Sequence, residues 1–543
     1  MSRFNLIDEK WIPVRMPDGT RDEFGIRDTL LRSKEIAAIE DPSPLVVASL
    51  HRFLLAVLYR ALEGPTDIEQ AKALFRGGLP GDKIVAYLEK WRPKFLLFDE
   101  KYPFGQIPSF VPKTWREWTA LAAEHNADNA KVLFDHVSLA KAGNISPGTA
   151  ARWLLATQSF AVSAGKSEIA HTGTAPSAGS VMAIPIASNL MDTLIFCLVP
   201  QNKEVMHSDI PLWEKEPETL EYLKKSVKAP DKKTGNEKNR AIERVANGIV
   251  DLYTWRTRSI LFKQSLSDGI SKVGLASGIG YKQSIEIDPM LGYNIKKISD
   301  KDSKEKMKIR VPIQFGEKGF WRDFDSLLPD NEHLAPKVIE NVATLSRIDR
   351  ARMPKGVMVL GQRYNPPRPN IVFWRQEHFA LPEALSGDKY IRSDIRRLLI
   401  DAEDAGKALW NGEDGLRACL NSSMGIYAKN ILARGGREVP FPDIKCFAQS
   451  VNAITWYWAI LESHFHEILS EFKLREDSDD VRRQWMEYIR ATLHNAWDQH
   501  CATVSAGDIW AIRAVVLAEG PVKHKLQELK EEILKYESKE EGV

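Results

Sequence analysis

The chain lacks the features of a disulfide-stapled, zinc-bound or membrane protein. Its 543 residues include four cysteines, Cys197, Cys419, Cys446 and Cys501, and no CxxC pair. Because such scattered thiols suit neither a disulfide framework nor a structural zinc site, we expect isolated buried thiols and no metal. A run of about 18 uncharged apolar residues is absent, and the opening MSRFNLIDEKWIPV has no apolar core of a secretion signal. We therefore expect a cytoplasmic protein with no membrane partner.

The chain also lacks a strong charge of one sign. With 75 Lys and Arg against 73 Asp and Glu, its net charge is +2, whereas a protein that mainly wraps nucleic-acid phosphate is usually far more basic. Any such function must then rest on local basic clusters, which lie over 223–244, over 296–310 and between 347 and 375. The third cluster contains Arg347, Arg350, Arg352, Lys355, Arg363, Arg368 and Arg375. One cluster is usually a solvated surface, but three in loop-like segments favour a binding surface.

The first part of the chain mixes short strands, helices and long loops. FNLID and WIPVRM alternate, PDG turns, and TRDEFGIRDTL returns, which predicts a hairpin. Apolar residues at helical spacing predict a helix over 45–62, which a Gly-Pro pair ends. The polar segment 134–149 predicts a long loop. A helix over 151–162 follows it, with Ser146 or Thr149 as its cap.

The middle of the chain predicts strands and one stiffened hairpin. The small residues of 163–180 predict an irregular loop, and 181–200 predict a strand, a turn and a buried run. Residues 281–325 predict short strands broken by a basic loop over 296–308. GVMVLGQRY and IVFWRQ, within 356–376, predict a hairpin whose NPPRPN tip is stiffened, because each proline fixes its own φ.

Long amphipathic segments dominate after about residue 385, and this is the pattern of a helical bundle. The sequence therefore predicts an α+β chain, with a mixed N-terminal domain over 1–384 and a helical domain over 385–543.

No motif predicts catalysis or a cofactor. The triplet 165–167 reads Gly-Lys-Ser like the end of a phosphate-binding loop, but Phe160 stands where that loop needs glycine. His464 and His466 are two residues apart on an expected helix, so they face different sides and cannot share a metal by that spacing. With Glu467 they predict the exposed side of a bundle helix. A hidden carboxylate pair among the 73 acidic residues stays possible.

Five segments in order match one known family. They are NLIDEKWIPV, LLATQSFAVSAGKS, IDPMLGYNIKK with VPIQFGEKGFWRDFDSLLP, VMVLGQRYNPPRPNIVFWRQEHFALP, and DIWAIRAVVLAEGPVKHKLQEL. In this order and spacing the chain resembles the CasA family, the large subunits of type I-E CRISPR Cascade complexes. The match runs end to end, although the specific motifs cover about a quarter of the chain, and none is strong by itself.

The resemblance implies a subunit of an RNA-guided surveillance complex rather than an enzyme. Such a subunit recognises a protospacer-adjacent motif in double-stranded target DNA, helps to open the duplex for R-loop formation, and recruits a separate helicase-nuclease. Its further partners are the other Cascade subunits and the guide RNA. The resemblance also implies that 1–384 carries motif recognition and the guide-handle and partner contacts, and that 385–543 is a four-helix bundle.

The resemblance also places DNA contacts in two segments. A glycine-rich loop of the family contacts the motif, and small residues there let backbone approach a base edge closely. A lysine of the family's central region reaches the electronegative minor groove, whose donor and acceptor code is degenerate. The matching positions are Ser163, Ala164, Gly165 and Lys166 for the loop, which has fewer glycines than the family's, and Lys296 or Lys297 for the lysine.

A wedge and a partner loop complete the implied site. Members of the family insert a hairpin tip that carries a glutamine between base pairs. The matching tip in this sequence is Asn365, Pro366, Pro367, Arg368 and Pro369. Counting back from the following strand places Arg368 at the glutamine position, whereas counting forward offers Gln362, far from the tip. The long loop that docks onto a neighbouring subunit and the guide handle matches 134–147, with Phe134 as a candidate contact.

Three other functions remain open from the sequence. The chain could be the large subunit of another type I CRISPR subtype, which would move the sites. It could be a nucleic-acid-dependent enzyme such as a nuclease, which would need an unrecognised cluster of metal-binding carboxylates or histidines. It could also be a helical scaffold that does not contact DNA.

Overall fold

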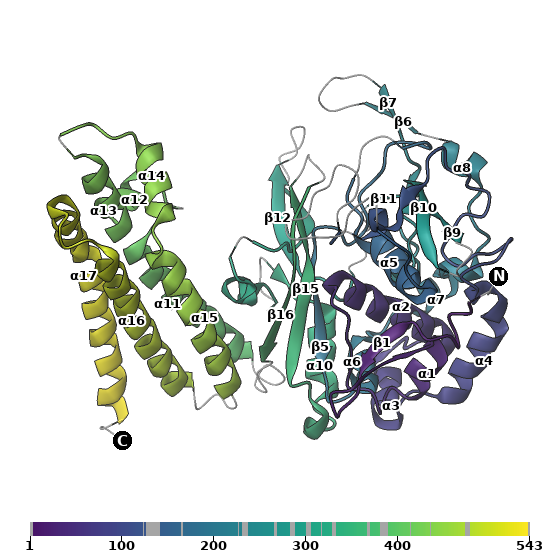
Figure 1. The fold of residues 1–543 in the computed structure, drawn as a ribbon. Coiled ribbons are helices and arrows are strands. Elements are labelled where there is room, and N and C mark those ends of the chain that lie inside the picture. The colour runs from purple at the N-terminus through teal and green to yellow at the C-terminus, as the bar shows by residue number, and fades with distance from the viewer. Residues whose placement is uncertain are drawn as a thin grey trace. The chain divides into compact units, whose positions relative to one another are not determined.

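The computed structural model divides the chain into two compact units (Figure 1). One, the N-terminal unit, comprises Met1–Lys318 and Ser326–His378; the other, the C-terminal unit, comprises Gly319–Asp325 and Phe379–Val543. The described residues are 4–122, 124–125, 142–163, 167–225, 227–230, 237–264, 269–282, 288–299, 306–316, 318–327, 333–365, 370–380, 389–412, 414–434, 436–472 and 478–540.

The N-terminal unit consists of short helices and strands between long connections. Its helices are α1 (Ile26–Leu31), α2 (Pro44–Leu62), α3 (Ile68–Gly77), α4 (Gly81–Trp91), α5 (Pro147–Phe160), α6 (Leu190–Cys197), α7 (Lys203–Ser208), α8 (Leu220–Lys224), α9 (Ile249–Tyr253) and α10 (Lys337–Leu345). Its strands are β1 (Ile12–Arg15), β2 (Arg21–Phe24), β3 (Ala38–Ile39), β4 (Arg116–Glu117), β5 (Val181–Ile186), β6 (Val227–Pro230), β7 (Glu237–Arg240), β8 (Glu243–Arg244), β9 (Arg258–Gln264), β10 (Ile270–Ser277), β11 (Gly280–Tyr281), β12 (Tyr293–Ser299), β13 (Lys306–Pro312), β14 (His333–Leu334), β15 (Gly356–Asn365) and β16 (Asn370–Ala380), the last ending in the C-terminal unit. The three-stranded sheets have the orders β2-β1-β3, β4-β10-β9, β13-β12-β14 and β16-β15-β5.

The expected N-terminal hairpin is confirmed for its two strands but not beyond them. β1 and β2 pair antiparallel, and Gly19 takes a φ of +87° in the turn between them. Residues expected to continue the return strand form α1 instead. Its first amides, of Ile26 and Arg27, donate to the carbonyls of Leu6 and Ile7, so the N-terminus of this short helix is satisfied by the preceding chain.

Helix α2 is the central core helix of the N-terminal unit. The Ser43 hydroxyl caps it by accepting the amide of Val46, which confirms the helix expected over 45–62. By length and composition alone the helix could cross a membrane, yet 89% of its most apolar 18-residue window is buried. Helices α4, α5 and α9 pack against it. Burial on all sides explains why its sequence is apolar around the whole circumference.

The C-terminal unit is helical, which confirms the α+β class. Its helices are α11 (Lys389–Leu409), α12 (Leu416–Asn421), α13 (Ser423–Leu432), α14 (Phe441–Ser450), α15 (Ala453–Glu471), α16 (Ser478–Thr503) and α17 (Ile509–Glu540). The long helices α11, α15 and α17 each pack against α16, while α13 packs against α17. The buried side chains of Tyr457, Phe465 and Trp485 lie in this core.

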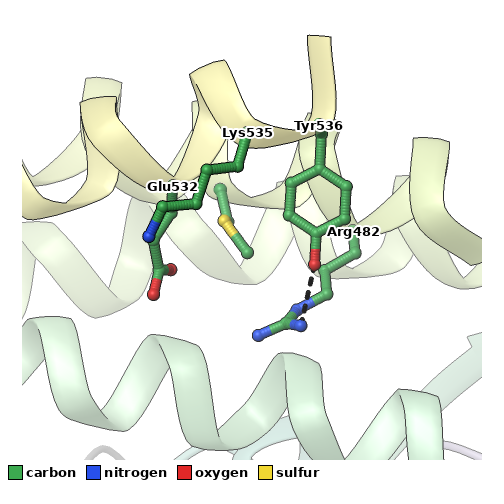
Figure 2. Close-up of a pocket in the computed structure, with 5 residues that line it drawn as sticks. Arg482, Glu532, Lys535 and Tyr536 are labelled. Carbon is green, nitrogen blue, oxygen red and sulfur yellow. Dashed lines mark hydrogen bonds between the residues drawn. The ribbon is translucent and has the colours of Figure 1, made fainter. Parts of the chain in front are cut away.

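A small surface pocket of about 210 Å³ lies between α16 and α17 (Figure 2). Its lining includes Arg482, Glu532, Lys535 and Tyr536. The Arg482 guanidinium donates to the Tyr536 hydroxyl at 2.9 Å and to the Asp401 carboxylate of α11 at 3.0 Å. The arginine in this pocket is therefore already paired within the unit, and it links three helices.

The two neighbouring histidines of α15 do not lie on an exposed face as expected. The His464 ring stacks on Tyr488 with a centroid distance of 4.0 Å, and His466 stacks on Phe379 at 5.0 Å. Both are half-buried, and burial lowers the pKa of His466. Aromatic neighbours from two other elements, Tyr488 of α16 and Phe379 of β16, therefore decide their placement.

The cysteines follow the expectation of isolated buried thiols only in part. All four are free, and Cys197 and Cys419 are buried. Cys446 is exposed and Cys501 is half-buried, so the expectation of burial is wrong for Cys446.

Candidate nucleic-acid interface

The segments with predicted DNA contacts are anchored around the first residues of β5. The hairpin of β15 and β16, whose tip is the predicted wedge, joins β5 through antiparallel pairing that sets Gly361 opposite Val181. The hairpin of β12 and β13 reaches the same place, since the Val181 amide donates to the carbonyl of Ile313 at 2.9 Å. The buried Gln362 amide of β15 donates to the carbonyl of Phe160, the last residue of α5. Figure 1 shows β16, β15 and β5, which form one sheet in that order.

Two glycines permit the close approach of β15 to the segment before β5. A Cβ atom on Gly361 would lie 2.2 Å from the carbonyl oxygen of Ser180, and Gly361 has a φ of +158°. A Cβ atom on Gly179, where φ is +72°, would lie 2.6 Å from the ring of Tyr364. Because any side chain at either position would clash, glycine is required for this junction.

The predicted motif loop leaves helix α5, whose N-cap is Ser146 rather than Thr149. Ser163, the first residue of the loop, donates its hydroxyl to the carbonyl of Thr172 at 2.8 Å. Beyond the loop, the Ser167 hydroxyl accepts the amide of Ser277 at 3.0 Å. The remaining predicted loop contacts, Ala164, Gly165 and Lys166, lie outside the described residues.

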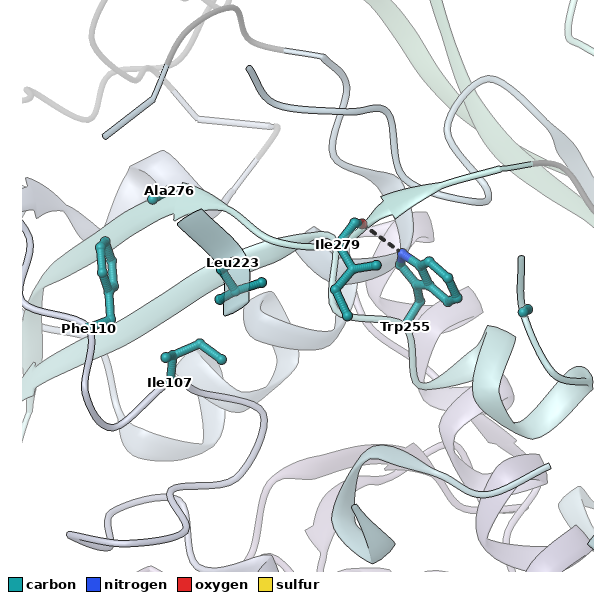
Figure 3. Packing of buried hydrophobic residues seen from close by; sticks show 7 residues of the cluster. Ile107, Phe110, Leu223, Trp255, Ala276 and Ile279 are labelled. Carbon is teal, nitrogen blue, oxygen red and sulfur yellow. Dashed lines mark hydrogen bonds between the residues drawn. The ribbon is translucent and has the colours of Figure 1, made fainter. Parts of the chain in front are cut away.

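A hydrophobic cluster packs against the β9–β10 strand pair, to which the chain after this loop is bonded through Ser167. It contains Ile107, Phe110, Leu223, Ala246, Trp255, Ala276 and Ile279 (Figure 3). The Trp255 indole donates to the carbonyl of Ile279 at 3.0 Å, as the dashed line in Figure 3 shows. This bond joins the chain entering β9 to the chain leaving β10, so the cluster fixes the end of the β9–β10 pair to which Ser167 is bonded.

The basic segment expected as a loop over 296–308 is partly strand. Lys296 and Lys297 belong to β12 and stand opposite Ile309 and Lys308 of β13. The alternating sequence KMKIRVP of β13 explains the difference, because a period of two favours strand pairing despite the positive charge. The assignment of the groove contact to Lys296 or Lys297 stays a prediction.

The two positions weighed for the wedge differ in burial. Gln362 is fully buried within β15, far from any surface at which DNA could be wedged apart. Asn365 is exposed at the end of β15, and β16 begins at Asn370. Pro366, Pro367, Arg368 and Pro369 lie outside the described residues, as does Phe134 of the predicted partner loop.

Two arginines of the third basic cluster are engaged in the fold. Arg352 forms an ion pair with Asp192 of α6 and donates to the carbonyl of Phe75. Arg375 of β16 donates to the carbonyl of Lys318 at 2.7 Å and lies 3.3 Å from Glu377. The interval 347–375 contains few acidic residues, but Asp192 of α6 and Glu377, just beyond the interval, pair with these two arginines. The two cations are therefore less available to a DNA surface than the sequence indicates.

A buried charge network, which the sequence did not predict, lies beside the same anchor. Arg52 of α2 pairs with Asp288 at 2.9 Å, and their side chains are only 1% and 4% exposed. Arg52 also donates to the hydroxyl of Ser177, while the Tyr253 hydroxyl donates to Asp288 at 3.2 Å. The Tyr293 hydroxyl accepts the Asp288 amide at 2.9 Å. The one available signal was an arginine near the middle of a mostly apolar helix.

The network joins the chain after the motif loop, at Ser177, to the start of β12, at Tyr293. Burial raises the pKa of both Tyr253 and Tyr293, so their hydroxyls stay protonated and can donate. Elsewhere, within the part of the chain that the structure describes, no group of three or more His, Cys, Asp or Glu side chains could hold a metal ion.

Solved structures with the same fold define the class of this chain. It matches "Structure of Thermus thermophilus CasA (Cse1)" with a TM-score of 0.78 and 26% identity, covering 97% of this chain and 100% of that one. It also matches "CRISPR RNA-guided surveillance complex" with a TM-score of 0.64 and 17% identity, covering 96% and 99% of the two chains. The fold is therefore that of a CRISPR-associated protein, and the second likeness concerns the fold alone.

Sequence comparison identifies the family. The model of the family CRISPR-associated protein Cse1 (CRISPR_cse1) matches residues 5–496. A curated relative, the CRISPR-associated protein CasA/Cse1 of Thermus thermophilus, is 29% identical over 541 residues, which cover 98% of this chain and 99% of that protein. The chain belongs to the Cse1 family, as the five sequence segments predicted.

Proposed function

We propose that this chain is the large subunit of a type I-E CRISPR RNA-guided surveillance complex. In this role it recognises a short protospacer-adjacent motif in double-stranded DNA, helps to open the duplex for R-loop formation, and recruits the helicase-nuclease. Its partners are target DNA, guide RNA and the other subunits of the complex. Base pairing with the guide would read the target sequence, while this protein reads only the short flank.

The convergence at β5 is the observation that carries the proposal. Segments around 163–166, 296–297 and 365–369 are far apart in sequence, yet their anchors meet at Val181, Ile313 and Gly361. A flank reader needs several contacts within a few base pairs, and a wedge must enter beside the motif being read. The anchoring of all three segments around one strand end supports the proposal, because it is the arrangement that both requirements call for.

The proposed roles follow from the chemistry of each segment. The backbone of 163–166 would approach the motif closely, and Lys296 or Lys297 would enter the electronegative minor groove. The tip 365–369 would insert between base pairs and be opposed by about a few kcal/mol of stacking per step. Phe134 would contact the guide handle or a neighbouring subunit, and the C-terminal helices would pack on small subunits and help to hold the displaced strand.

The proposal is tested by binding of guide-loaded complex, assembled with and without this chain, to duplexes that carry a matching target and randomised flanks. We expect high affinity only with the chain present, and enrichment of a short flank. Binding should weaken steeply with salt, because phosphate contacts release counterions. Equal binding and no enrichment in the two preparations would contradict the proposal, and divalent-ion-dependent cleavage by the chain alone would favour a nuclease.

Removing the wedge tip should impair opening of the duplex but not later pairing. We expect that replacing Pro366–Pro369 with Asn-Gly, a sequence suited to a two-residue hairpin turn, weakens binding to closed duplex by about tenfold or more, since unstacking one step costs a few kcal/mol. A target already melted beside the flank should restore near-normal binding. Gel-shift titrations on the two targets measure the ratio, and an equal loss on both would assign the tip another role.

A further inference from the structure

A single buried arginine holds both ends of the chain that contains the motif loop. Arg258, the first residue of β9, donates from Nη2 to the carbonyl of Val162 at 2.7 Å and from Nη1 to the carbonyl of Gly173 at 2.8 Å. One planar guanidinium therefore binds the residue directly before Ser163 and the residue directly after Thr172. The Ser163 hydroxyl bond to the Thr172 carbonyl closes the same interval from within.

The backbone of Arg258 is itself fixed to helix α5. Its amide donates to Gln158 Oε1 at 2.8 Å, and its carbonyl accepts from Gln158 Nε2 at 2.9 Å. The Thr257 hydroxyl also donates to the Gln158 carbonyl at 2.8 Å. The arginine is thus held by the helix that leads into the loop, and its own position has little freedom.

The charge of Arg258 is balanced by carbonyl oxygens rather than by a carboxylate. It is 4% exposed, and within the described parts of the chain no Asp or Glu forms an ion pair with it. Burial lowers its pKa to about 10, so it stays charged at neutral pH. Arg256, two residues earlier and 6% exposed, differs because it pairs with the Glu218 carboxylate. A buried cation without a carboxylate is costly, which suggests a function beyond stability.

We propose that Arg258 is a positioning residue for flank recognition, which it serves by fixing the two ends of residues 162–173. This inference rests on the proposed function, since it assigns a cause to the selectivity of that same loop. A loop that reads bases with its backbone cannot adjust through side-chain rotamers, so its selectivity depends on where its ends are held. Five donors in a rigid plane suit this task, whereas an ammonium group cannot bind both carbonyls in the same fixed geometry.

The test compares flank selectivity with fold stability in guide-loaded complexes containing the full chain. The probes are two matched-target duplexes, one with the flank that wild-type complex enriches and one with that flank scrambled. For Arg258→Met we expect the affinity ratio between them to fall about tenfold, the equivalent of one lost hydrogen bond to a charged group. Affinity for the scrambled duplex should change little, and Arg258→Lys should recover part of the ratio.

Arg256→Met is the matched control, because it removes a buried arginine from the same segment without touching 162–173. It should lower the melting temperature while the affinity ratio stays at the wild-type value. A ratio unchanged in both Arg258 variants, with wild-type complex selective, would overturn the positioning role and leave the proposed function standing. If wild-type complex shows no selectivity, the proposed function fails and this inference falls with it.

Amide hydrogen exchange of the free chain gives a second measurement that does not need DNA. Exchange within 162–173 should rise about tenfold or more in Arg258→Lys, as expected when a charged hydrogen bond is lost, while exchange in α2 stays unchanged. Because Arg258→Lys keeps the positive charge, it still tests whether Arg258 positions residues 162–173 if Arg258→Met does not fold. Unchanged exchange in 162–173 would overturn the inference.

Discussion

Replacing Arg52 with Met is expected to lower the free energy of unfolding of the N-terminal unit by about 3–5 kcal/mol. Asp288 is 4% exposed and would lose the cation that lies 2.9 Å away, so a buried carboxyl group would be left without its ion-pair partner. Its remaining partners, the Tyr253 hydroxyl and the Met290 amide, do not supply a positive charge. The expected loss is a large part of the roughly 5–15 kcal/mol that stabilises a typical protein.

Denaturant unfolding followed by tryptophan fluorescence measures this loss. The double variant Arg52→Met with Asp288→Asn should recover much of it, since no unpaired charge remains buried. Arg21→Met is the exposed control: Arg21 pairs with Glu40 on the surface and should cost no more than about 1 kcal/mol. An Arg52→Met loss as small as that of Arg21→Met would mean that the buried pair adds nothing to stability.

Local patterns predicted the elements whose causes are local. Helix α2 was predicted because its apolar periodicity and the Gly-Pro stop lie within twenty or so residues, close to the range over which helix signals act. The hairpin of β15 and β16 was predicted because two largely apolar runs, GVMVLGQRY and IVFWRQ, flank a proline-rich turn. The basic composition of 296–308 was misleading, because strand pairing between β12 and β13 depends on alternation and not on charge.

The arrangement of the candidate site could not be predicted in the same way. The pairing of β5 with β15, and the reach of Arg258 to Val162 and Gly173, join positions that are distant in sequence. No periodicity reports such contacts, which depend on how the elements pack. The family resemblance supplied candidate positions such as Ser163, but the residues that hold them, Arg258 and Arg52, carry no motif.

More than one stretch of the chain connects the two units. The unit boundaries fall at Lys318–Gly319, Asp325–Ser326 and His378–Phe379, so the chain passes between the units three times. The first passage comes after β13 and the last lies within β16, between His378 and Phe379, so the chains of both proposed DNA-contacting hairpins run into the C-terminal unit. The segment Gly319–Asp325 therefore belongs to the C-terminal unit, although it lies in the sequence between the two stretches that form the N-terminal unit.

Trp321, in this inserted segment, should be a major source of stability for the C-terminal unit. Its side chain is 1% exposed, and its ring lies 5.2 Å from Phe465 and 6.5 Å from Trp485, measured between centroids. The neighbouring Arg322 lies over the Trp458 ring and donates to Glu403 at 2.7 Å. The segment is thus held by both aromatic packing and charge.

We expect Trp321→Ala to destabilise the C-terminal unit by about 3–5 kcal/mol, the usual range for removing a buried large aromatic side chain. Trp510→Ala is the matched control, since Trp510 lies in the same unit and is 48% exposed; it should cost less than about 1 kcal/mol.

Proteolysis during a temperature series, with fragments assigned by mass, measures the unfolding temperature of each unit separately. Cleavage in α15 and α16 should begin at a lower temperature in Trp321→Ala than in Trp510→Ala, while cleavage in α2 should not change. Equal onset in the two variants would mean that the C-terminal helices hold together without the inserted segment, and an earlier onset in Trp321→Ala would mean that their packing depends on it.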